Sequence, residues 1–93
     1  MTWGFISELP ITPDEYDALD AELPDDPPGL ILHIASRSSG GMRIIGIWQS
    51  EADHRRFEAE QLMPAMGRLG WPPPENPPQP VEFDVHNMRG PGA

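Results

Sequence analysis

Two apolar stretches decide the fold: residues 30–35 (LILHIA) and residues 42–48 (MRIIGIW). Both are rich in residues that favour β-strands, and the segment Arg37–Gly41 between them (RSSGG) predicts a β-hairpin with a five-residue loop. Neither stretch alternates cleanly between apolar and polar residues, so both faces of the hairpin must be covered. Helices of the same chain can cover one face, and we expect a second copy of the chain to cover the other. The hairpin therefore predicts a homodimer.

The strongest local signal lies before the hairpin, in Thr12–Glu15 (TPDE). A capping threonine, a proline at the first helical position and a glutamate at the third form a capping box, which predicts the start of a helix. Tyr16, Leu19 and Leu23 recur on one face of this helix, and Pro24 stops it.

A second helix is predicted to begin at Glu51, after the capping residue Ser50. Pro64 cannot donate a hydrogen bond to the helix backbone, so it predicts a break or kink near Leu62, or the start of a short separate helix. Gly70 predicts the end of this helical region.

Two further strands complete the predicted fold, at Trp3–Glu8 and at Val81–His86. Trp71–Pro80 contains six prolines and predicts a stiff polyproline-II strap within a single domain of residues 1–89, which a short tail follows at 90–93. The order strand, helix, strand, strand, helix, strand predicts an α+β, ferredoxin-like fold, with a four-stranded antiparallel sheet and two helices on one face.

The charge and the absence of cysteine exclude several classes of protein. The 93 residues include six basic and fifteen acidic side chains, for a formal net charge of −9, and no cysteine. The negative charge argues against binding of nucleic acids or anionic membranes, because that binding relies on lysine and arginine. Without cysteine no disulfide or thiolate metal site can form, and no apolar run approaches the ~20 residues that span a bilayer. We therefore expect a cytoplasmic protein.

His33 is the leading candidate for a catalytic residue, because it interrupts an otherwise apolar strand. If Ser36 pairs with Met42, His33 stands opposite Ile45 and faces an apolar cavity or the dimer core. A hydrogen-bonded structural histidine is the alternative. In the same register Trp48 lies on the opposite face, either packed in the core or forming a wall for a ligand.

Four other residues are candidates for ligand binding. Tyr16 and His86 could act as secondary polar groups, while Phe57 and Met66 could line an irregular apolar pocket. Core packing is the simpler account of the last two.

Two polar clusters have the spacing of metal ligands. Glu82, Asp84 and His86 fall on one face of the last predicted strand, but no clear fourth ligand accompanies them. His54 and Glu58 lie one helical turn apart without the second histidine of a zincin motif, so we interpret them as a solvated pair. We predict no metal and no other cofactor.

The chain resembles the dimeric α/β-barrel superfamily and, within it, small actinobacterial proteins related to the antibiotic biosynthesis monooxygenases. The resemblance lies in the order of residues 29–35, 41–48, 48–51, 57, 62–66 and 85–87. It implies a homodimer whose two sheets pack into a barrel, with a pocket between the helices and the sheet of each subunit. Members of the superfamily include cofactor-independent oxygenases of aromatic polyketides, haem-degrading monooxygenases and isomerases, and others are non-catalytic binders.

Trp48 matches the tryptophan that ends a strand in the monooxygenase-like pattern. Phe57 stands where that pattern has a histidine, and His54 lies one turn earlier, so the chain departs from the pattern at the catalytic or haem-binding position. We predict a homodimer that binds an apolar or aromatic, polyketide-like molecule, as a cofactor-independent monooxygenase, cyclase or isomerase with His33 as the base. The alternative is a non-catalytic ligand-binding or accessory protein, and the sequence leaves open whether the chain is an enzyme.

Overall fold

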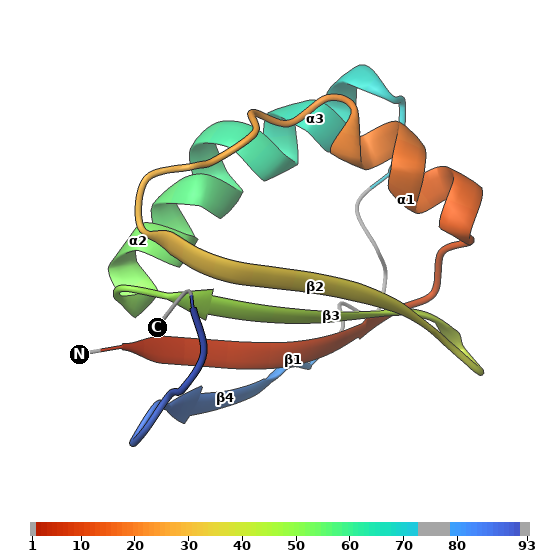
Figure 1. The fold of residues 1–93 in the computed structure, drawn as a ribbon. Coiled ribbons are helices and arrows are strands. Elements are labelled where there is room, and N and C mark those ends of the chain that lie inside the picture. The colour runs from red at the N-terminus through yellow and green to blue at the C-terminus, as the bar shows by residue number, and fades with distance from the viewer. Residues whose placement is uncertain (1, 73–78, 92–93) are drawn as a thin grey trace.

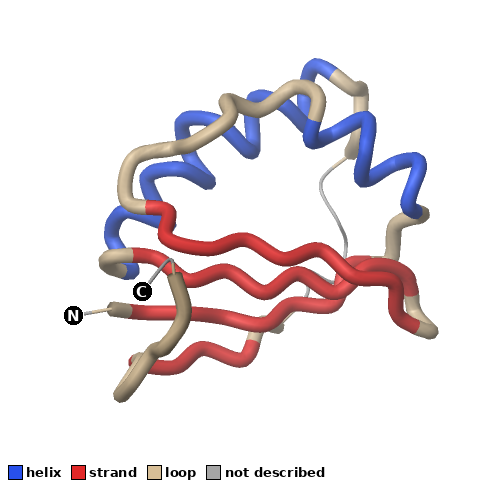
Figure 2. The backbone as a smooth tube through the Cα atoms, viewed as in Figure 1, coloured by secondary structure: helices blue, strands red, loops and turns tan. Residues whose placement is uncertain are grey.

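In the computed structural model, which describes residues 2–72 and 79–91, a four-stranded antiparallel sheet carries all the described helices on one face (Figure 1). The strands lie in the order β2-β3-β1-β4, which confirms the predicted ferredoxin-like fold. Figure 2 shows the helical layer above the strands. The elements are β1 (Trp3–Leu9), α1 (Pro13–Asp20), β2 (Leu30–Ser38), β3 (Gly41–Trp48), α2 (Glu51–Phe57), the π-helical segment η1 (Glu58–Leu62), α3 (Met63–Arg68) and β4 (Val81–Asp84).

The capping box at the start of α1 is formed as predicted. The Thr12 hydroxyl accepts a hydrogen bond from the Glu15 backbone N–H at 3.1 Å, and the Glu15 carboxylate accepts one from the Thr12 N–H at 2.9 Å. The helix ends at Asp20, so it does not reach Leu23 as expected. Residues after Asp20 form turns that lead into a proline-containing loop.

Pro64 lies in the first turn of α3, close to the predicted alternative of a short helix starting there, and a π-helical turn stands where a break or kink was predicted. The Met63 N–H bonds to the carbonyl of Glu58, five residues back, so α2 continues through η1 into α3. The wider π-helical turn accommodates a residue that has no N–H to donate. Gly70 ends this region as predicted. It adopts φ 75°, and the N–H of Trp71 returns to the carbonyl of Met66, which closes the C-terminus of α3.

The hairpin has a different register from the predicted one. Its strands extend to Ser38 and start again at Gly41, so the loop is two residues long, and Ser36 pairs with Arg43. Gly41 permits this tight connection, because it has φ 137° and any Cβ there would lie 2.2 Å from the Leu9 carbonyl oxygen. His33 consequently stands opposite Gly46, one position from the predicted Ile45.

The two faces of the sheet have different surroundings. The face under the helices carries most of the buried core, including Trp3, Ile44 and Trp48. The other face carries two adjacent apolar rows that cross the sheet, of which the first is Ile34, Ile45, Ile6 and Val81, and the second is Leu32, Ile47, Gly4 and Phe83. We call these the outer rows. Leu32, Ile34 and Val81 are 47%, 42% and 65% exposed.

The last strand is shorter than predicted, since β4 ends at Asp84. The Val85 N–H still bonds to the Thr2 carbonyl at 2.9 Å, and the chain then leaves the sheet. Most of the predicted polyproline strap, residues 73–78, lies outside the described residues, as do residues 92 and 93 of the predicted tail. No helix in the described part of the chain has both the length and the apolar character to cross a bilayer.

Candidate functional site

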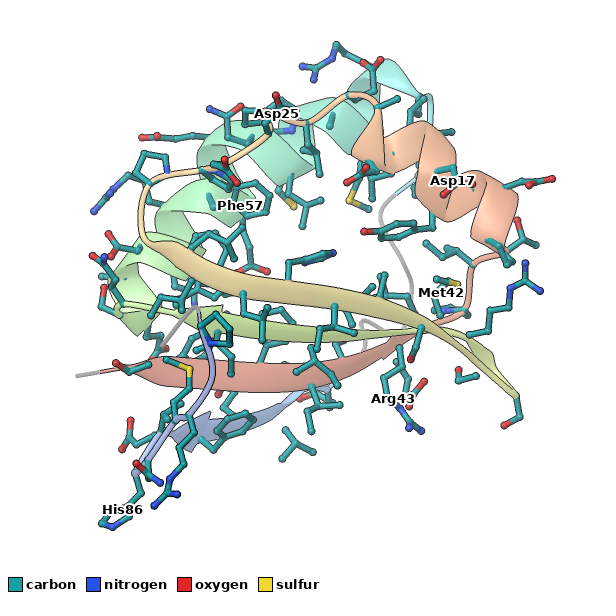
Figure 3. The ribbon with its side chains drawn as sticks, viewed as in Figure 1. Asp17, Asp25, Met42, Arg43, Phe57 and His86 are labelled. Carbon is teal, nitrogen blue, oxygen red and sulfur yellow. The ribbon has the colours of Figure 1, made fainter. Side chains whose placement is uncertain are left out.

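A half-open pocket of about 130 Å³ lies between α1, the β2–β3 hairpin and α2. The loop of residues 21–29 contributes to its walls, and Figure 3 shows Asp25 in this loop with Phe57 beneath it. We call it the α1–β2 pocket. Its lining residues are Tyr16, Leu19, Asp20, Leu23, Pro24, Asp25, Pro27, Leu30, His33, Trp48 and Phe57.

Tyr16 and His33 meet in this pocket. The Tyr16 hydroxyl oxygen lies 2.7 Å from Nε2 of His33, and the two rings stack with centroids 6.2 Å apart and planes 13° from parallel. Helix α1 presents the phenol and strand β2 presents the imidazole. Sequence analysis singled out both residues separately, but it did not predict that they form a pair.

Their surroundings keep both groups of this pair uncharged near neutral pH. Burial lowers the pKa of His33, and the Asp20 carboxylate opposes that change. Burial also raises the pKa of Tyr16, and the carboxylates of Asp20 and Asp17 act in the same direction. A neutral imidazole and a protonated phenol share one hydrogen bond, in which the Tyr16 O–H donates to Nε2 when the ring proton of His33 sits on Nδ1.

Trp48 and Phe57 supply the aromatic wall of the pocket. Trp48 is only 3% exposed, and its ring centroid lies 5.3 Å from that of Phe57. The prediction that Trp48 and His33 lie on opposite faces is wrong. The changed hairpin register turns His33 toward the helix layer, because its partner is Gly46, two positions from Trp48 and on the same face of β3. The bulge between Leu30 and Leu32 affects Leu30, which it places opposite Trp48.

Gly46, which has no side chain, leaves space for the rings of Trp48 and Phe5. It lies opposite His33 on β3, and a Cβ at this position would come 2.6 Å from the Phe5 ring and 3.2 Å from Nε1 of Trp48. The aromatic rings therefore close over the glycine backbone.

A second cavity, of about 290 Å³, lies between β1 and the helical segment of residues 51–68. Met66 lines it, so this predicted ligand-binding residue is separated from Tyr16, His33, Trp48 and Phe57. His86 lines neither cavity. It is exposed beyond the end of β4, on the side away from the helices (Figure 3).

His54 lines this second cavity and is 7% exposed, so the prediction of a solvated His54–Glu58 pair is wrong. Its ring packs against Trp3, Phe5 and Trp48 at centroid distances of 4.5 to 5.2 Å. Nε2 lies 3.5 Å from the Glu58 carboxylate, while Nδ1 is buried without a hydrogen-bond partner among the described residues. Burial lowers the pKa of His54, and the nearby Glu58 carboxylate opposes that effect.

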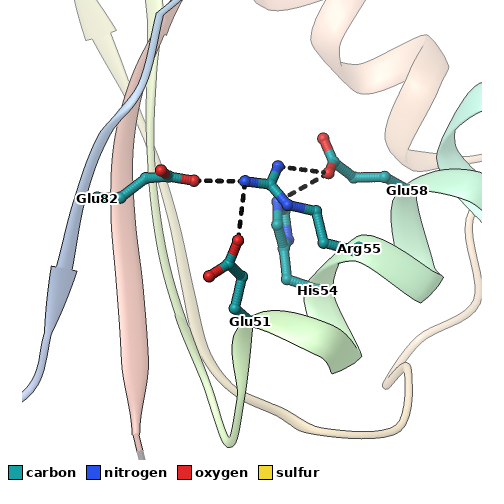
Figure 4. A network of polar contacts seen from close by, with 5 residues as sticks. All are labelled: Glu51, His54, Arg55, Glu58 and Glu82. Carbon is teal, nitrogen blue, oxygen red and sulfur yellow. Dashed lines mark hydrogen bonds and ion pairs between the residues drawn. The ribbon is translucent and has the colours of Figure 1, made fainter.

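Arg55, next to His54, ties helix α2 to the edge strand β4. Its guanidinium contacts Glu51 and Glu58 of the helical segment, each at 3.2 Å, and Glu82 of β4 at 2.6 Å (Figure 4). The same group lies 5.9 Å from the ring centroid of Trp3. The contacts hold β4, a strand of four residues, against the helix layer.

Two residues of the α1–β2 pocket, Asp20 and Asp25, were missed by sequence analysis. Asp20 could have been found from the acidic C-terminal end of the first helix, because a carboxylate there is unfavourable for the helix. No comparable signal indicates Asp25. In the part of the chain that the structure describes, no three histidine, aspartate or glutamate side chains are placed to hold a metal ion. Glu82 and His86 in particular diverge, because β4 ends between them.

No protein-family model matches this chain, and no curated protein matches it. Two solved structures share its fold. One is described as a putative antibiotic biosynthesis monooxygenase from Chloroflexus aurantiacus, with TM-score 0.68, 18% identity, and coverage of 97% of this chain and 98% of that chain. The other is a protein of unknown function from Nitrosomonas europaea, with TM-score 0.64, 13% identity, and coverage of 97% and 93%. At these identities the two likenesses show the fold alone, and it is the ferredoxin-like fold that the sequence predicts.

Proposed function

We propose that this chain binds a small phenol, enol or related single-ring molecule in the α1–β2 pocket and accepts a proton from it through Tyr16 and His33. The observation that carries the proposal is the 2.7 Å contact between Tyr16 Oη and His33 Nε2 inside a pocket with aromatic and aliphatic walls. A few convergent polar groups in an apolar cavity are typical of ligand sites.

The size of the pocket sets the size of the ligand. Its volume of about 130 Å³ is close to the ~150 Å³ of an engineered apolar cavity that binds benzene. A single ring would fit beside Trp48 and Phe57, and larger substituents would extend through the open side of the pocket.

The proposed proton transfer proceeds along the hydrogen bond between the two residues. The Tyr16 oxygen accepts the acidic proton of the ligand while the proton of Tyr16 passes to Nε2 of His33. The ligand is left as a phenolate or enolate, Tyr16 is again a phenol and His33 becomes an imidazolium, whose charge the Asp20 carboxylate stabilises. Loss of this proton is a first step common to isomerisation, cyclisation and direct oxygenation by dioxygen.

A non-catalytic ligand-binding or accessory role is the second candidate. The burial of His33 favours it, because burial lowers the pKa of the imidazole and so makes it a weaker base. In this role the Tyr16–His33 pair would only orient a bound hydroxyl group.

We also propose that the functional unit is a homodimer that buries the outer rows of two sheets against each other. Exposure of Leu32, Ile34 and Val81 on a continuous apolar surface supports this assembly. The polar row beside it, in which Glu8 accepts hydrogen bonds from Ser38 and Arg43, would border the interface.

Titration of the labelled protein with 4-ethylphenol, followed by NMR, tests the binding. We expect shifts at Tyr16, His33, Trp48 and Phe57, and affinity about two- to tenfold weaker in Tyr16→Phe, because one neutral hydrogen bond contributes about 0.5–1.5 kcal/mol. His86→Gln is the matched control and should bind as the wild type does. The proposal fails if the shifts lie outside the pocket or if Tyr16→Phe binds as tightly as the wild type.

Exchange of the acidic C–H protons of phenylacetone in D2O separates the two candidate functions. A catalytic pair should accelerate exchange, and His33→Ala should lower the catalysed rate by about 10²–10⁴-fold, the usual contribution of one general base. Binding without any acceleration of exchange would favour the non-catalytic role.

A further inference from the structure

The α1–β2 pocket has an acidic character that the proposed proton transfer does not require. Asp20 and Asp25 both line it, and among the described residues no arginine or lysine does. Neither carboxylate forms an ion pair within residues 2–72 and 79–91. Arg68 reaches the neighbouring loop, but its guanidinium is held by the Glu22 side chain at 2.8 Å and by the Glu22 carbonyl at 3.0 Å.

The position of Asp20 adds to this negative potential. It is the last residue of α1, where the helix dipole already concentrates partial negative charge, and no basic residue lies in the last turn. A carboxylate at this end lowers the stability of the helix. Its charge acts on both members of the Tyr16–His33 pair: it adds to the effect of burial in raising the pKa of Tyr16, and it opposes the effect of burial in lowering the pKa of His33.

Aromatic side chains occupy the same pocket. Tyr16, Trp48 and Phe57 line it from three different elements, and the faces of such rings attract cations. Carboxylates and aromatic faces together favour a positively charged group over a neutral or negatively charged one. The net charge of −9 also attracts cationic ligands and repels anionic ones as they approach the protein.

We propose that the ligand of this pocket is a phenol or enol that also carries an alkylammonium group, with the ring beside Trp48 and Phe57 and the ammonium group at Asp20 and Asp25. This inference rests on the proposed function, because it specifies the chemical class of the molecule bound there. It excludes aromatic carboxylates, whose charge the two aspartates would repel.

The expected selectivity is moderate, because both aspartates are exposed to solvent. An exposed ion pair and an exposed cation–π contact each change affinity by about two- to fivefold, so we expect an ammonium group to improve binding by roughly tenfold. Added salt should reduce this advantage.

The test compares three ligands of similar size by calorimetry: tyramine, 4-ethylphenol and 4-hydroxyphenylacetate, which are cationic, neutral and anionic at pH 7. We expect tyramine to bind about tenfold more tightly than 4-ethylphenol, and 4-hydroxyphenylacetate to bind most weakly. In the double variant Asp20→Asn/Asp25→Asn the preference for tyramine over 4-ethylphenol should fall from about tenfold to the two- to fivefold that the aromatic rings supply. This variant should fold, since removal of a carboxylate from the end of α1 favours the helix.

Asp84→Asn is the matched control, because it removes a charge from β4 at the opposite edge of the sheet. It should keep the wild-type order of affinities. If the wild type binds tyramine and 4-ethylphenol equally, or if the double variant keeps the full wild-type preference for tyramine, the inference is wrong while the proposed function stands. If none of the three ligands binds, the proposed function fails and the inference fails with it.

Discussion

The Tyr16 hydroxyl oxygen and Nε2 of His33 lie 2.7 Å apart, although the residues are 17 positions apart in the chain. This hydrogen bond joins α1 to β2 beside the pocket, and Leu19 is the buried residue that anchors α1 to the rest of the fold. A change in either partner therefore alters both the electrostatics of the pocket and the attachment of α1.

His33 should titrate below the usual histidine range, because burial disfavours its charged form. Tyr16→Phe should raise the pKa of His33, because the phenol can no longer donate to the neutral ring. Asp20→Asn should lower it, because the stabilising carboxylate charge is lost. NMR titration of the His33 Cε1 proton measures the pKa in the wild type and in both variants. A pKa of His33 that neither substitution changes would contradict the described geometry.

Replacement of His54 by phenylalanine should stabilise the protein at neutral pH by about 1 kcal/mol. The buried Nδ1 has no partner among the described residues, and an unsatisfied buried polar atom costs about 1–3 kcal/mol. Urea unfolding measures the change. His86→Phe is the control, since that side chain is exposed and should have little effect.

The same variant should also be less sensitive to acid. Burial lowers the folded-state pKa of His54 from its ordinary value of 6.5, so below about pH 6.5 the unfolded chain binds more protons than the folded one. The free energy of unfolding of the wild type should therefore fall as the pH decreases through this range, and His54→Phe should remove part of that dependence. An unchanged slope between pH 7.5 and 5 would show that His54 does not contribute.

Replacement of Arg55 by methionine should loosen β4. Arg55 is the residue that connects Glu82 of the strand to Glu51 and Glu58 of the helical segment, so its loss removes a link between the two layers. The contacts are about half exposed, so global stability should fall by only about 1 kcal/mol, and less at high salt. Hydrogen exchange of the β4 amides should accelerate clearly. Arg56→Met, which breaks a pair with Asp53 inside the same helix, should leave that exchange unchanged.

Ile34→Glu should convert a dimer into a monomer. The substitution places a charge in the middle of an outer row, where the proposed assembly would bury it without a partner. Analytical ultracentrifugation measures the mass. Met63→Glu changes an exposed apolar residue of the helix layer and should leave the dimer intact. A monomeric wild type would refute the proposed assembly directly.

Several features of the fold were predictable because short segments encode them. Thr12 and Glu15 lie three positions apart, and the side chain of each accepts a hydrogen bond from the backbone N–H of the other. These bonds need no other part of the chain, so the start of α1 follows from local sequence. The apolar runs of the hairpin and the alternation after Val81 likewise indicate strands. The element order then leaves few ways to arrange four strands and a helical layer.

The composition of the site was not predictable in the same way. A shift of one residue in strand pairing moves a side chain to the other face, and nothing local distinguishes Ser36 opposite Met42 from Ser36 opposite Arg43. The bulge after Leu30 places that residue opposite Trp48, and no local pattern in the sequence indicates it. His54 is a similar case, since a helical histidine can be solvated or buried according to the neighbours that approach it.

The sequence by itself determined the types and order of the elements, the cap of the first helix and the ferredoxin-like arrangement, because these depend on contacts a few residues apart and on general rules of chain connection. The tertiary structure alone decided that His33 meets Tyr16, that Trp48 shares their pocket and that Asp20 and Asp25 line it. Those neighbours come from separate segments, and strand register and the path of the α1–β2 loop bring them together.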